Sequence, residues 1–259
     1  MNQGHERIWN VLSWNVRGIN SPSKWNVIRD KITETACDIV YFQETKKETL
    51  DLAFFKNVCP SWIDAFEFLP SIRASGGLLV AWKSSLFKGE LVFSNEYAIS
   101  VEFNSQHNDS CWLLTNVYAP CQAEDKLAFL EWLKSIQMPD NMDWLILGDF
   151  NLIRRPENRN KEGGNIMEMF LFNEAISALG LNEITLQGRK YTWSNKQASP
   201  LLEKLDWAFT SNSWLLSYLD TSLSALDMTP SDHCPCVVKI SSHIPKSAIF
   251  RFENYCQYC

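Results

Sequence analysis

The chain has 259 residues, a formal net charge of −6 and a pI near 5.3, and 46% of its residues are hydrophobic. This composition excludes a disordered chain, and the acidity excludes general electrostatic attraction to nucleic acid, so a polyanion would need a local patch or a metal ion. No apolar run is as long as a membrane span and no signal-peptide pattern is seen, so we expect a monomer without membrane association, in the nucleus or cytoplasm.

The first half of the chain alternates strands with helices and then becomes a run of strands. An apolar stretch at Ile8–Trp14 predicts a strand, and the apolar spacing over Lys24–Thr35 predicts a helix. A second buried strand and a second helix are predicted at Asp38–Phe42 and Leu50–Val58. From Trp62 onward the pattern predicts strands separated by polar turns, namely Leu78–Trp82, Gly89–Phe93, Ala98–Phe103 and Cys111–Val117.

The second half returns to mixed elements. Helices are predicted at Glu124–Ile136, before Pro139, and at Met167–Leu179, before Gly180. Further strands are predicted at Trp144–Leu147, Tyr191–Ser194, Leu205–Thr210 and Val237–Ile240. Mixed βα units around a long series of strands favour an α/β protein with two mainly antiparallel sheets packed face to face and helices outside. Ser241–Lys246 is the candidate domain boundary.

The eight cysteines are scattered and lie mostly in apolar segments. This distribution is typical of free buried thiols in a reducing compartment. A four-thiolate zinc site made by Cys234 and Cys236 with Cys256 and Cys259 is the less favoured alternative, because one pair begins a strand and the other lies at the chain end.

Four polar clusters stand next to the predicted apolar strands: Ser13–Gly18, Gln43–Lys46, Gly148–Asn151 and Ser231–His233. Apolar strand interiors cannot solvate such groups, so clusters at strand ends are expected to meet in one crevice. Each cluster alone has a structural interpretation, as a turn, a helix cap or a solvated carboxylate. Together they offer hard oxygen ligands for a Mg²⁺-like ion, and an Asp and a His for phosphate-ester chemistry.

In this order the clusters resemble the endonuclease/exonuclease/phosphatase superfamily, and most closely the endonuclease domain of plant non-LTR retrotransposons. The shared phrases are Leu12–Gly18, Gln43–Lys46, Asn116–Pro120, Leu147–Asn151, Gly188–Asn195, Lys204–Asp206 and Ser231–Pro235. The resemblance implies a DNase I-like, four-layer α/β sandwich over residues 1–252. Residues 253–259 are then expected to be a truncated or divergent tail, where related proteins continue toward a reverse transcriptase.

The resemblance also implies a metal site. Glu44 would be the principal ligand of Mg²⁺, with Mn²⁺ as a substitute, and Asp232 would complete the surroundings of the metal. Asn15 would steady the metal or contact phosphate. Tyr118 would lie against the phosphate or the leaving group.

The same resemblance implies the catalytic groups. Asp149, oriented by Asn151, would activate the attacking water. His233 would contact the scissile phosphate, with Asp206 holding its imidazole. A carboxylate aligned on water and an Asp–His pair are the residue types that this chemistry requires.

Two departures concern contacts with DNA. Arg17 stands where the abasic-site enzymes have an acidic residue, which adds a positive charge able to contact DNA phosphate. Cys121 follows the Tyr-Ala-Pro turn where those enzymes soon have an Asn, so one phosphate-side hydrogen bond is expected to be absent. In the loop Ser194–Glu203, Asn195, Lys196 and Gln197 can hydrogen-bond to base edges or phosphates. A solvated hairpin whose leucines pack on the sheet is the alternative.

The function predicted from these residues is a Mg²⁺-dependent endonuclease that nicks one strand of double-stranded DNA and leaves a 3′-hydroxyl, as in target-primed retrotransposition. The alternatives are an abasic-site repair endonuclease, another phosphodiesterase or phosphatase of the superfamily, and an inactive retrotransposon remnant. The retained set of expected catalytic residues argues against decay of the site.

Overall fold

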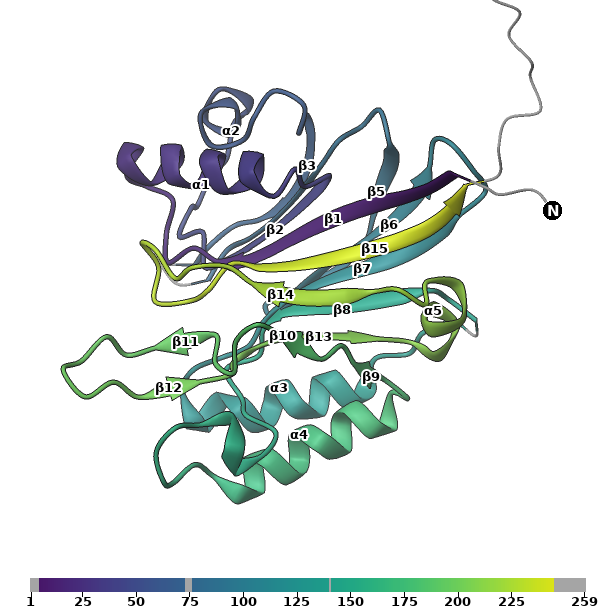
Figure 1. Ribbon diagram of the computed structural model, residues 1–259. Coiled ribbons are helices and arrows are strands. Elements are labelled where there is room, and N and C mark those ends of the chain that lie inside the picture. The colour runs from purple at the N-terminus through teal and green to yellow at the C-terminus, as the bar shows by residue number, and fades with distance from the viewer. Residues whose placement is uncertain (1–4, 73–75, 140, 245–259) are drawn as a thin grey trace, which may run out of the picture.

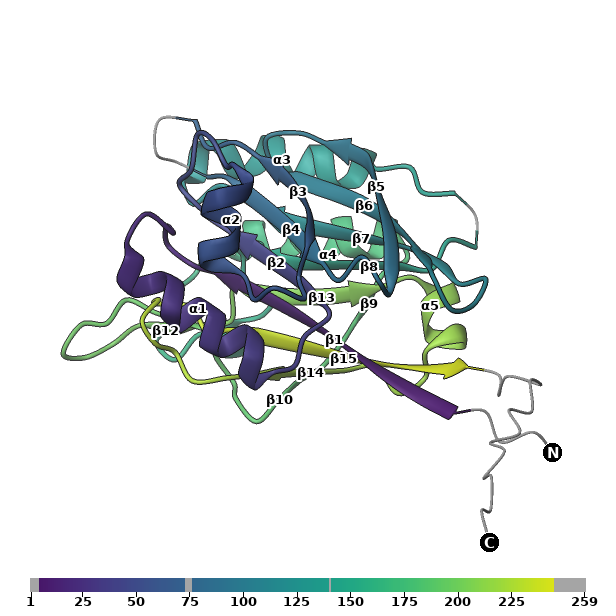
Figure 2. The ribbon, with the colours of Figure 1, turned by 90° about the horizontal axis from the view of Figure 1, so that it is seen from above.

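The computed structural model describes residues 5–72, 76–139 and 141–244, which form four layers (Figure 1). Two sheets pack face to face. Helices α1 (Pro22–Glu34) and α2 (Leu52–Val58) cover the outer side of one sheet, as the view from above also shows (Figure 2). Helices α3 (Ala123–Ser135) and α4 (Ile166–Ala178) cover the other. The predicted α/β sandwich is therefore confirmed, and the predicted tail, residues 253–259, lies outside the described residues.

The sheet beneath α1 and α2 has seven strands in the order β10-β14-β15-β1-β2-β4-β3. Their bounds are β1 His5–Asn15, β2 Ile39–Gln43, β3 Ala65–Leu69, β4 Leu78–Trp82, β10 Leu186–Gln187, β14 Ser222–Ala225 and β15 Cys236–Ile244. The pairs β1–β2 and β10–β14 are parallel and the other neighbours are antiparallel. Since β15 continues to Ile244, the domain boundary expected at Ser241–Lys246 is wrong for the described part of that segment.

The second sheet has six strands in the order β5-β6-β7-β8-β13-β9, with only β7–β8 parallel among the described pairs. Their bounds are β5 Phe87–Ser94, β6 Ala98–Ser105, β7 Cys111–Tyr118, β8 Trp144–Asp149, β9 Asn182–Glu183 and β13 Asp206–Thr210. A separate hairpin is formed by β11 (Trp193–Ser194) and β12 (Leu202–Glu203). The short helices are η1 (Pro156–Asn158) and α5 (Asn212–Ser217).

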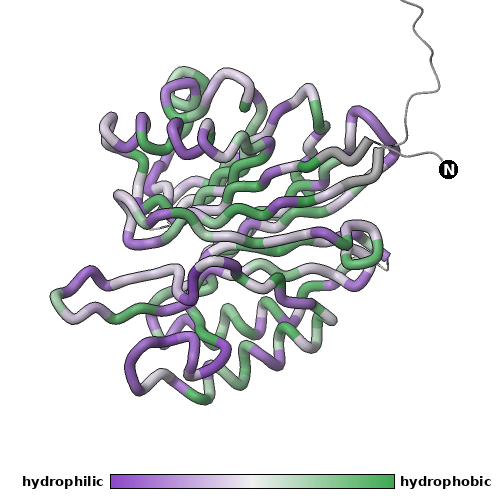
Figure 3. Tube along the Cα trace, viewed as in Figure 1, coloured by the Kyte–Doolittle hydropathy of each residue, from purple (hydrophilic) through white to green (hydrophobic). Residues whose placement is uncertain are grey.

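Alternating side chains on the strands build the apolar layers. On β8, Leu145 and Leu147 belong to the cluster between the two sheets, whereas Ile146 belongs to the cluster beneath α3 and α4. In the central cluster, Trp9 of one sheet stacks on Trp112 of the other, with ring centroids 4.9 Å apart. The tube in Figure 3 shows hydrophobic stretches along the strands and hydrophilic residues in many of the connecting loops. Successive side chains of a strand point to opposite faces of its sheet, so a strand packed on both faces contributes alternate residues to the two clusters.

The same alternation directs the polar residues at the strand ends. Asn15 continues the inward series of Trp9 and Val11 on β1, and Asp149 continues that of Leu145 and Leu147 on β8. Two residues that end central strands of different sheets therefore face each other between the sheets. The fold thus places a polar cluster at one end of its apolar centre.

Several elements differ from the sequence prediction. Strand β3 lay unassigned within the region predicted to contain strands, and β14 and α5 were not predicted. Strand β14, with the sequence Ser-Leu-Ser-Ala, has a single large apolar residue and so gives little periodic signal. The strand predicted at Tyr191–Ser194 is only the two residues of β11, because Tyr191 and Thr192 belong to the connection before it.

Two expectations from composition concern the membrane and the cysteines. Among the described residues, no helix has the length and apolar character needed to cross a membrane. The six described cysteines are free thiols, and Cys37, Cys59, Cys234 and Cys236 are buried. Cys256 and Cys259, the other half of the alternative zinc site, lie outside the described residues.

Candidate active site

Adjacent strand ends bring the predicted residues into two facing rows. Tyr118 on β7 pairs with Asp149 on β8, which in turn pairs with Asp206 on β13. On the opposite sheet, Asn15 ends β1. Its amide nitrogen Nδ2 donates to Asp149 Oδ2 at 2.8 Å and so joins the two sheets.

Asp149 is fixed by its neighbours and is 1% exposed. Oδ1 accepts from the backbone N–H of Asn151 at 3.0 Å, and the Asn151 side chain in turn donates to the Ala119 carbonyl at 2.8 Å. Gly148 precedes Asp149 with φ of +139°, and a Cβ there would overlap the backbone of Val117. The backbone around Gly148 and the hydrogen bonds from Asn15 and Asn151 therefore hold the Asp149 carboxylate in one position.

His233 lies on the other side of Asp149 and is held by Asp206. Its Nδ1 is 2.9 Å from Asp206 Oδ2, and its Nε2 is 3.6 Å from Asp149 Oδ2. The backbone N–H of His233 donates to Ser231 Oγ, whose hydroxyl donates to the Asn15 carbonyl. His233 is thus held at both its ring and its backbone, with Nε2 directed toward Asp149.

The charges of Asp149, Asp206 and His233 shift the pKa values of Asp149 and His233. Burial alone would lower the pKa of the His233 imidazole, but the negative charges of Asp206 and Asp149 outweigh it and raise that pKa to about 9. Burial raises the pKa of the Asp149 carboxyl to about 6, against the opposing charge of His233. At neutral pH these pKa values favour a charged His233 imidazole beside an ionised Asp149 carboxylate. A carboxylate whose pKa lies near the working pH is suited to general base catalysis.

The predicted metal ligands Glu44 and Asp232 lie in a second group, on either side of Arg17. The Arg17 guanidinium contacts Glu44 Oε2 through Nη1 at 3.2 Å and Asp232 Oδ1 through Nε at 3.1 Å. Lys46 Nζ adds a third contact, 3.2 Å from Glu44 Oε1. Two carboxylates that converge on one cation form a hard oxygen donor set, which fits a divalent ion such as Mg²⁺.

Among the described residues, the acidic and histidine side chains that come close enough to hold a metal as a set of three are Asp149, Asp206 and His233, whose ligand atoms lie within 4.8 Å of one another. This set differs from the predicted ligands Glu44, Asp232 and Asn15. An imidazolium has no lone pair for a metal, and the raised pKa of His233 favours that form. We therefore interpret the trio as an ion-pair network, and Glu44 and Asp232 stay the predicted metal ligands.

Unusual backbone conformations gather at the site. Arg17, Glu44 and Asn151 have φ values of +51°, +55° and +48°, and each comes one or two residues after the last residue of β1, β2 or β8. Residues other than glycine seldom adopt this region, and where they do the surroundings must impose it. Strained residues at three neighbouring strand ends are typical of a functional site.

Tyr118 lies half-buried beside both groups. Burial and then the charges of Glu44 and Asp149 raise the pKa of its hydroxyl, so it stays protonated. It is therefore a hydrogen-bond donor near the two carboxylates, the position expected for contact with a phosphate or leaving group.

The predicted DNA-contacting loop is the β11–β12 hairpin, which extends from the sheets on the side where β1 ends (Figure 1). Its base is attached to the site, because the backbone N–H of Ser194 donates to the Asp232 carbonyl and Trp193 pairs with His233. Within the loop, Asn195 Oδ1 accepts from the backbone N–H groups of Gln197 and Leu201.

The other two predicted residues of that loop differ in their contacts. Lys196 Nζ donates to the Pro230 carbonyl at 2.9 Å, and Gln197 is exposed. The exposed Gln197 side chain is thus open to contact with DNA. Asn195 holds the backbone of the loop, and Lys196 ties the loop to Pro230.

Further residues that support the site had no role in the sequence prediction. Trp193 Nε1 donates to Asp232 Oδ2 at 3.0 Å, and Trp14 Nε1 donates to the His233 carbonyl at 3.1 Å. Ser231 links His233 to Asn15, as described above. All three stand inside the motif phrases, so the signal was present, but a tryptophan in an apolar phrase is normally assigned to the core.

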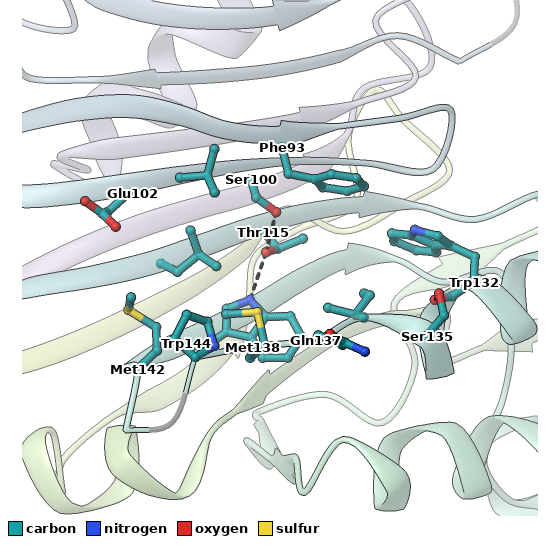
Figure 4. A pocket seen from close by; sticks show the side chains of 14 residues that line it. Phe93, Ser100, Glu102, Thr115, Trp132, Ser135, Gln137, Met138, Met142 and Trp144 are labelled. Carbon is teal, nitrogen blue, oxygen red and sulfur yellow. Dashed lines mark hydrogen bonds between the residues drawn. The ribbon is translucent and has the colours of Figure 1, made fainter.

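A separate cavity of about 470 Å³ lies between the six-stranded sheet and the end of α3 (Figure 4). On its wall, Ser100 Oγ and Thr115 Oγ1 are 2.8 Å apart, and Trp144 Nε1 donates to Thr115 Oγ1. The lining is mostly apolar, and its residues Leu113 and Trp144 belong to the cluster on the helix side of the sheet. This cavity therefore opens away from Asp149 and His233 and is not part of the candidate active site.

Comparisons with known proteins bear on the family and the fold. The model of the Endonuclease/Exonuclease/phosphatase family matches residues 12–233, a range that spans the site from Asn15 to His233. No curated protein matches the sequence.

Three solved structures illustrate the likeness. AP endonuclease LMAP from Leishmania major is 18% identical, with a TM-score of 0.68 over 92% of this chain and 89% of that one. The endonuclease domain of TRAS1, a telomere-specific non-LTR retrotransposon, is 13% identical, with a TM-score of 0.66 over 90% and 98%. The 3′ phosphatase NExo from Neisseria, bound to a product DNA hairpin, is 15% identical, with a TM-score of 0.63 over 89% and 98%. At these identities the likeness establishes the fold.

Proposed function

Because the chain belongs to the endonuclease/exonuclease/phosphatase family, we propose that it is a Mg²⁺-dependent endonuclease that nicks one strand of double-stranded DNA and leaves a 3′-hydroxyl. Family membership makes it a metal-dependent phosphodiester hydrolase; the metal, the substrate and the product are the proposal. The observation that carries it is the position of Asp149, fixed between Asn15 and Asn151 with the His233–Asp206 pair beside it.

In this proposal each residue has one task. Asp149 accepts the proton of a water that attacks the phosphorus, and the bond from phosphorus to the 3′ oxygen breaks. His233, kept charged and oriented by Asp206, donates a hydrogen bond to a phosphoryl oxygen on which negative charge grows. Tyr118 donates toward the phosphate or the leaving oxygen.

Glu44 and Asp232 would hold the metal, with the Asn15 amide nearby. When bound, a divalent ion offsets negative charge on the phosphoryl and leaving oxygens. Mn²⁺ would support the same chemistry, because it accepts the same oxygen ligands.

Double-stranded DNA as the substrate is supported by the likeness to the retrotransposon endonuclease domain and by the β11–β12 hairpin next to the site. We propose that Arg17 and Gln197 contact the DNA, with Asn195 and Lys196 shaping the loop. A 3′-hydroxyl product would prime a reverse transcriptase, the partner expected to be fused C-terminally in related proteins. The protein would act as a monomer in the nucleus or the cytoplasm.

An abasic-site repair activity is the second candidate, because the AP endonuclease from Leishmania major shares the fold over nearly the whole chain. One assay separates the candidates: supercoiled plasmid, an abasic oligonucleotide and a 3′-phosphorylated oligonucleotide are each incubated with Mg²⁺ or with EDTA. We expect nicked plasmid with Mg²⁺ only, and ligation after nicking to show a 3′-hydroxyl. Preferential cleavage of the abasic strand would favour repair, release of phosphate would favour a phosphatase, and no turnover of any substrate would indicate an inactive remnant.

A further inference from the structure

Arg17 occupies the point on which the two proposed metal ligands converge. Its guanidinium contacts both oxygens of Glu44, at 3.3 and 3.2 Å, and Asp232 Oδ1 at 3.1 Å. Glu44 is 6% exposed. A buried carboxylate needs a counter-charge, and in this structure Arg17 supplies one to Glu44.

The backbone beneath Arg17 is fixed, so this contact does not depend on a freely moving segment. The Arg17 N–H donates to Asn15 Oδ1 at 3.1 Å, and the Gly18 N–H donates to the Glu44 carbonyl at 2.7 Å. Lys24 Nζ donates to the carbonyls of Val16, Arg17 and Gly18. The guanidinium itself is partly exposed, since the Arg17 side chain is 46% exposed. The loop is therefore rigid while the end of the side chain has room to turn toward solvent.

The charges in the group already balance. Glu44 and Asp232 contribute two negative charges, and Arg17 and Lys46 contribute two positive ones. A divalent ion added to this balanced group would face two cations at short range, which disfavours binding. Arg17 is the cation that touches both carboxylates, so its departure would expose both to the metal.

We propose that Arg17 is a resident cation of the metal site, which a divalent ion must displace from Glu44 and Asp232 before it binds. This inference rests on the proposed function, because it takes those two residues as the metal ligands. When a ligand binds only one of two states of a protein, its apparent Kd equals the intrinsic Kd divided by the fraction of protein in that state. If Arg17 leaves the carboxylates for about a tenth of the time, the apparent Kd for the metal rises about tenfold. The displaced guanidinium would then be free to meet a DNA phosphate.

The test is a titration of Mn²⁺ into the whole protein without DNA, followed by calorimetry and by the paramagnetic resonance signal of free Mn²⁺. Arg17→Met removes the charge and keeps the length of the side chain, and we expect it to bind Mn²⁺ about tenfold more tightly than the wild type. Arg29→Met is the matched control, because Arg29 lies on α1 and donates to the Asn57 carbonyl outside the site. It should bind Mn²⁺ as the wild type does. Arg17→Gln gives a second variant without the charge if Arg17→Met fails to fold.

The outcomes separate this inference from the proposed function. Unchanged or weaker Mn²⁺ binding by Arg17→Met overturns the inference. If only Arg17→Gln folds, the same outcomes apply to that variant. Weaker binding would show that Arg17 positions Glu44 for the metal. Glu44→Gln should bind Mn²⁺ poorly with or without Arg17. If Glu44→Gln binds Mn²⁺ like the wild type, the metal lies elsewhere and the proposed metal site fails. If Glu44→Gln abolishes binding while Arg17→Met leaves it unchanged, only the displacement by Arg17 is refuted.

Discussion

The two halves of the candidate site differ in how firmly they are built. On one side, Asp149, Asp206 and His233 are buried, and each is held by short side chains or by backbone. On the other, Glu44 and Asp232 contact the long cationic side chain of Arg17, which is nearly half exposed. Short buried groups lose little entropy when they act, whereas long exposed ones can change partners. The difference indicates a rigid half for the chemistry and an adjustable half for ligands.

The strongest test of the rigid half is Asp149→Asn. The substitution keeps the size and can keep the bonds from Asn15 and Asn151, but it removes the base, so plasmid nicking should fall by about 10²–10⁴-fold. Thermal melts should stay close to those of the wild type. Asp220→Asn, an exposed Asp in a turn, is the control and should nick normally. Folded Asp149→Asn protein with wild-type nicking would remove Asp149 from the mechanism.

The pairing within the rigid half is tested by His233→Ala, Asp206→Ala and the double variant. We expect each single change to slow nicking by on the order of 10²-fold, and the double variant to be little slower than the worse single one, because the two residues act as a unit. Rates from single-turnover nicking check this. A double variant slowed by the product of both effects would mean that Asp206 works independently of His233.

The pH profile sharpens the comparison, because Asp149 and His233, whose pKa values are both raised, lie in the rigid half. Nicking should fall as the pH drops through about 6, where Asp149 gains a proton, and fall again as it rises through about 9, where His233 loses one. Asp206→Asn removes a negative charge that raises the pKa of His233, so the alkaline limb should move to lower pH. An alkaline limb that stays in place in this variant would assign it to another group.

The smallest effect on rate is expected at the hairpin. Replacing residues 195–201 with a different loop leaves Trp193, and its bond to Asp232, in place. Nick positions along a sequenced duplex should then redistribute, while the total nicking rate changes by less than about tenfold. An unchanged pattern of nicks would mean that the hairpin is a connection without a role in target choice.

The sequence predicted the layers and most strands because they follow from local periodicity. The apolar runs Trp144–Leu147 and Ile8–Trp14 predict buried strands, and the polar residues that follow such strands are expected at their ends, where they can meet in one crevice. Asn15 and Asp149 could be found in this way, and the structure brings them within hydrogen-bond distance.

The remaining features depend on contacts between distant parts of the chain. The bond from Trp193 to Asp232 and the position of Arg17 between Glu44 and Asp232 join segments far apart in sequence, which no local period encodes. Strands of two residues, such as β11 and β12, are too short to show a period at all. The prediction that Glu44 is a metal ligand rested on the resemblance to the family, and the contact between Glu44 and Arg17 was not predicted.

The pairing of β1 with β15 has a consequence during synthesis of the protein. Asn15 ends the first described strand, whereas His233 lies three residues before the last described one, and Ser231 links the two. A nascent chain that has reached Asp149 already holds its base but has neither His233 nor a partner for the outer edge of β1. Nicking activity should therefore arise only after the segment from Ser231 through β15 has been synthesised, and until then an unpaired strand edge is exposed to association with other chains.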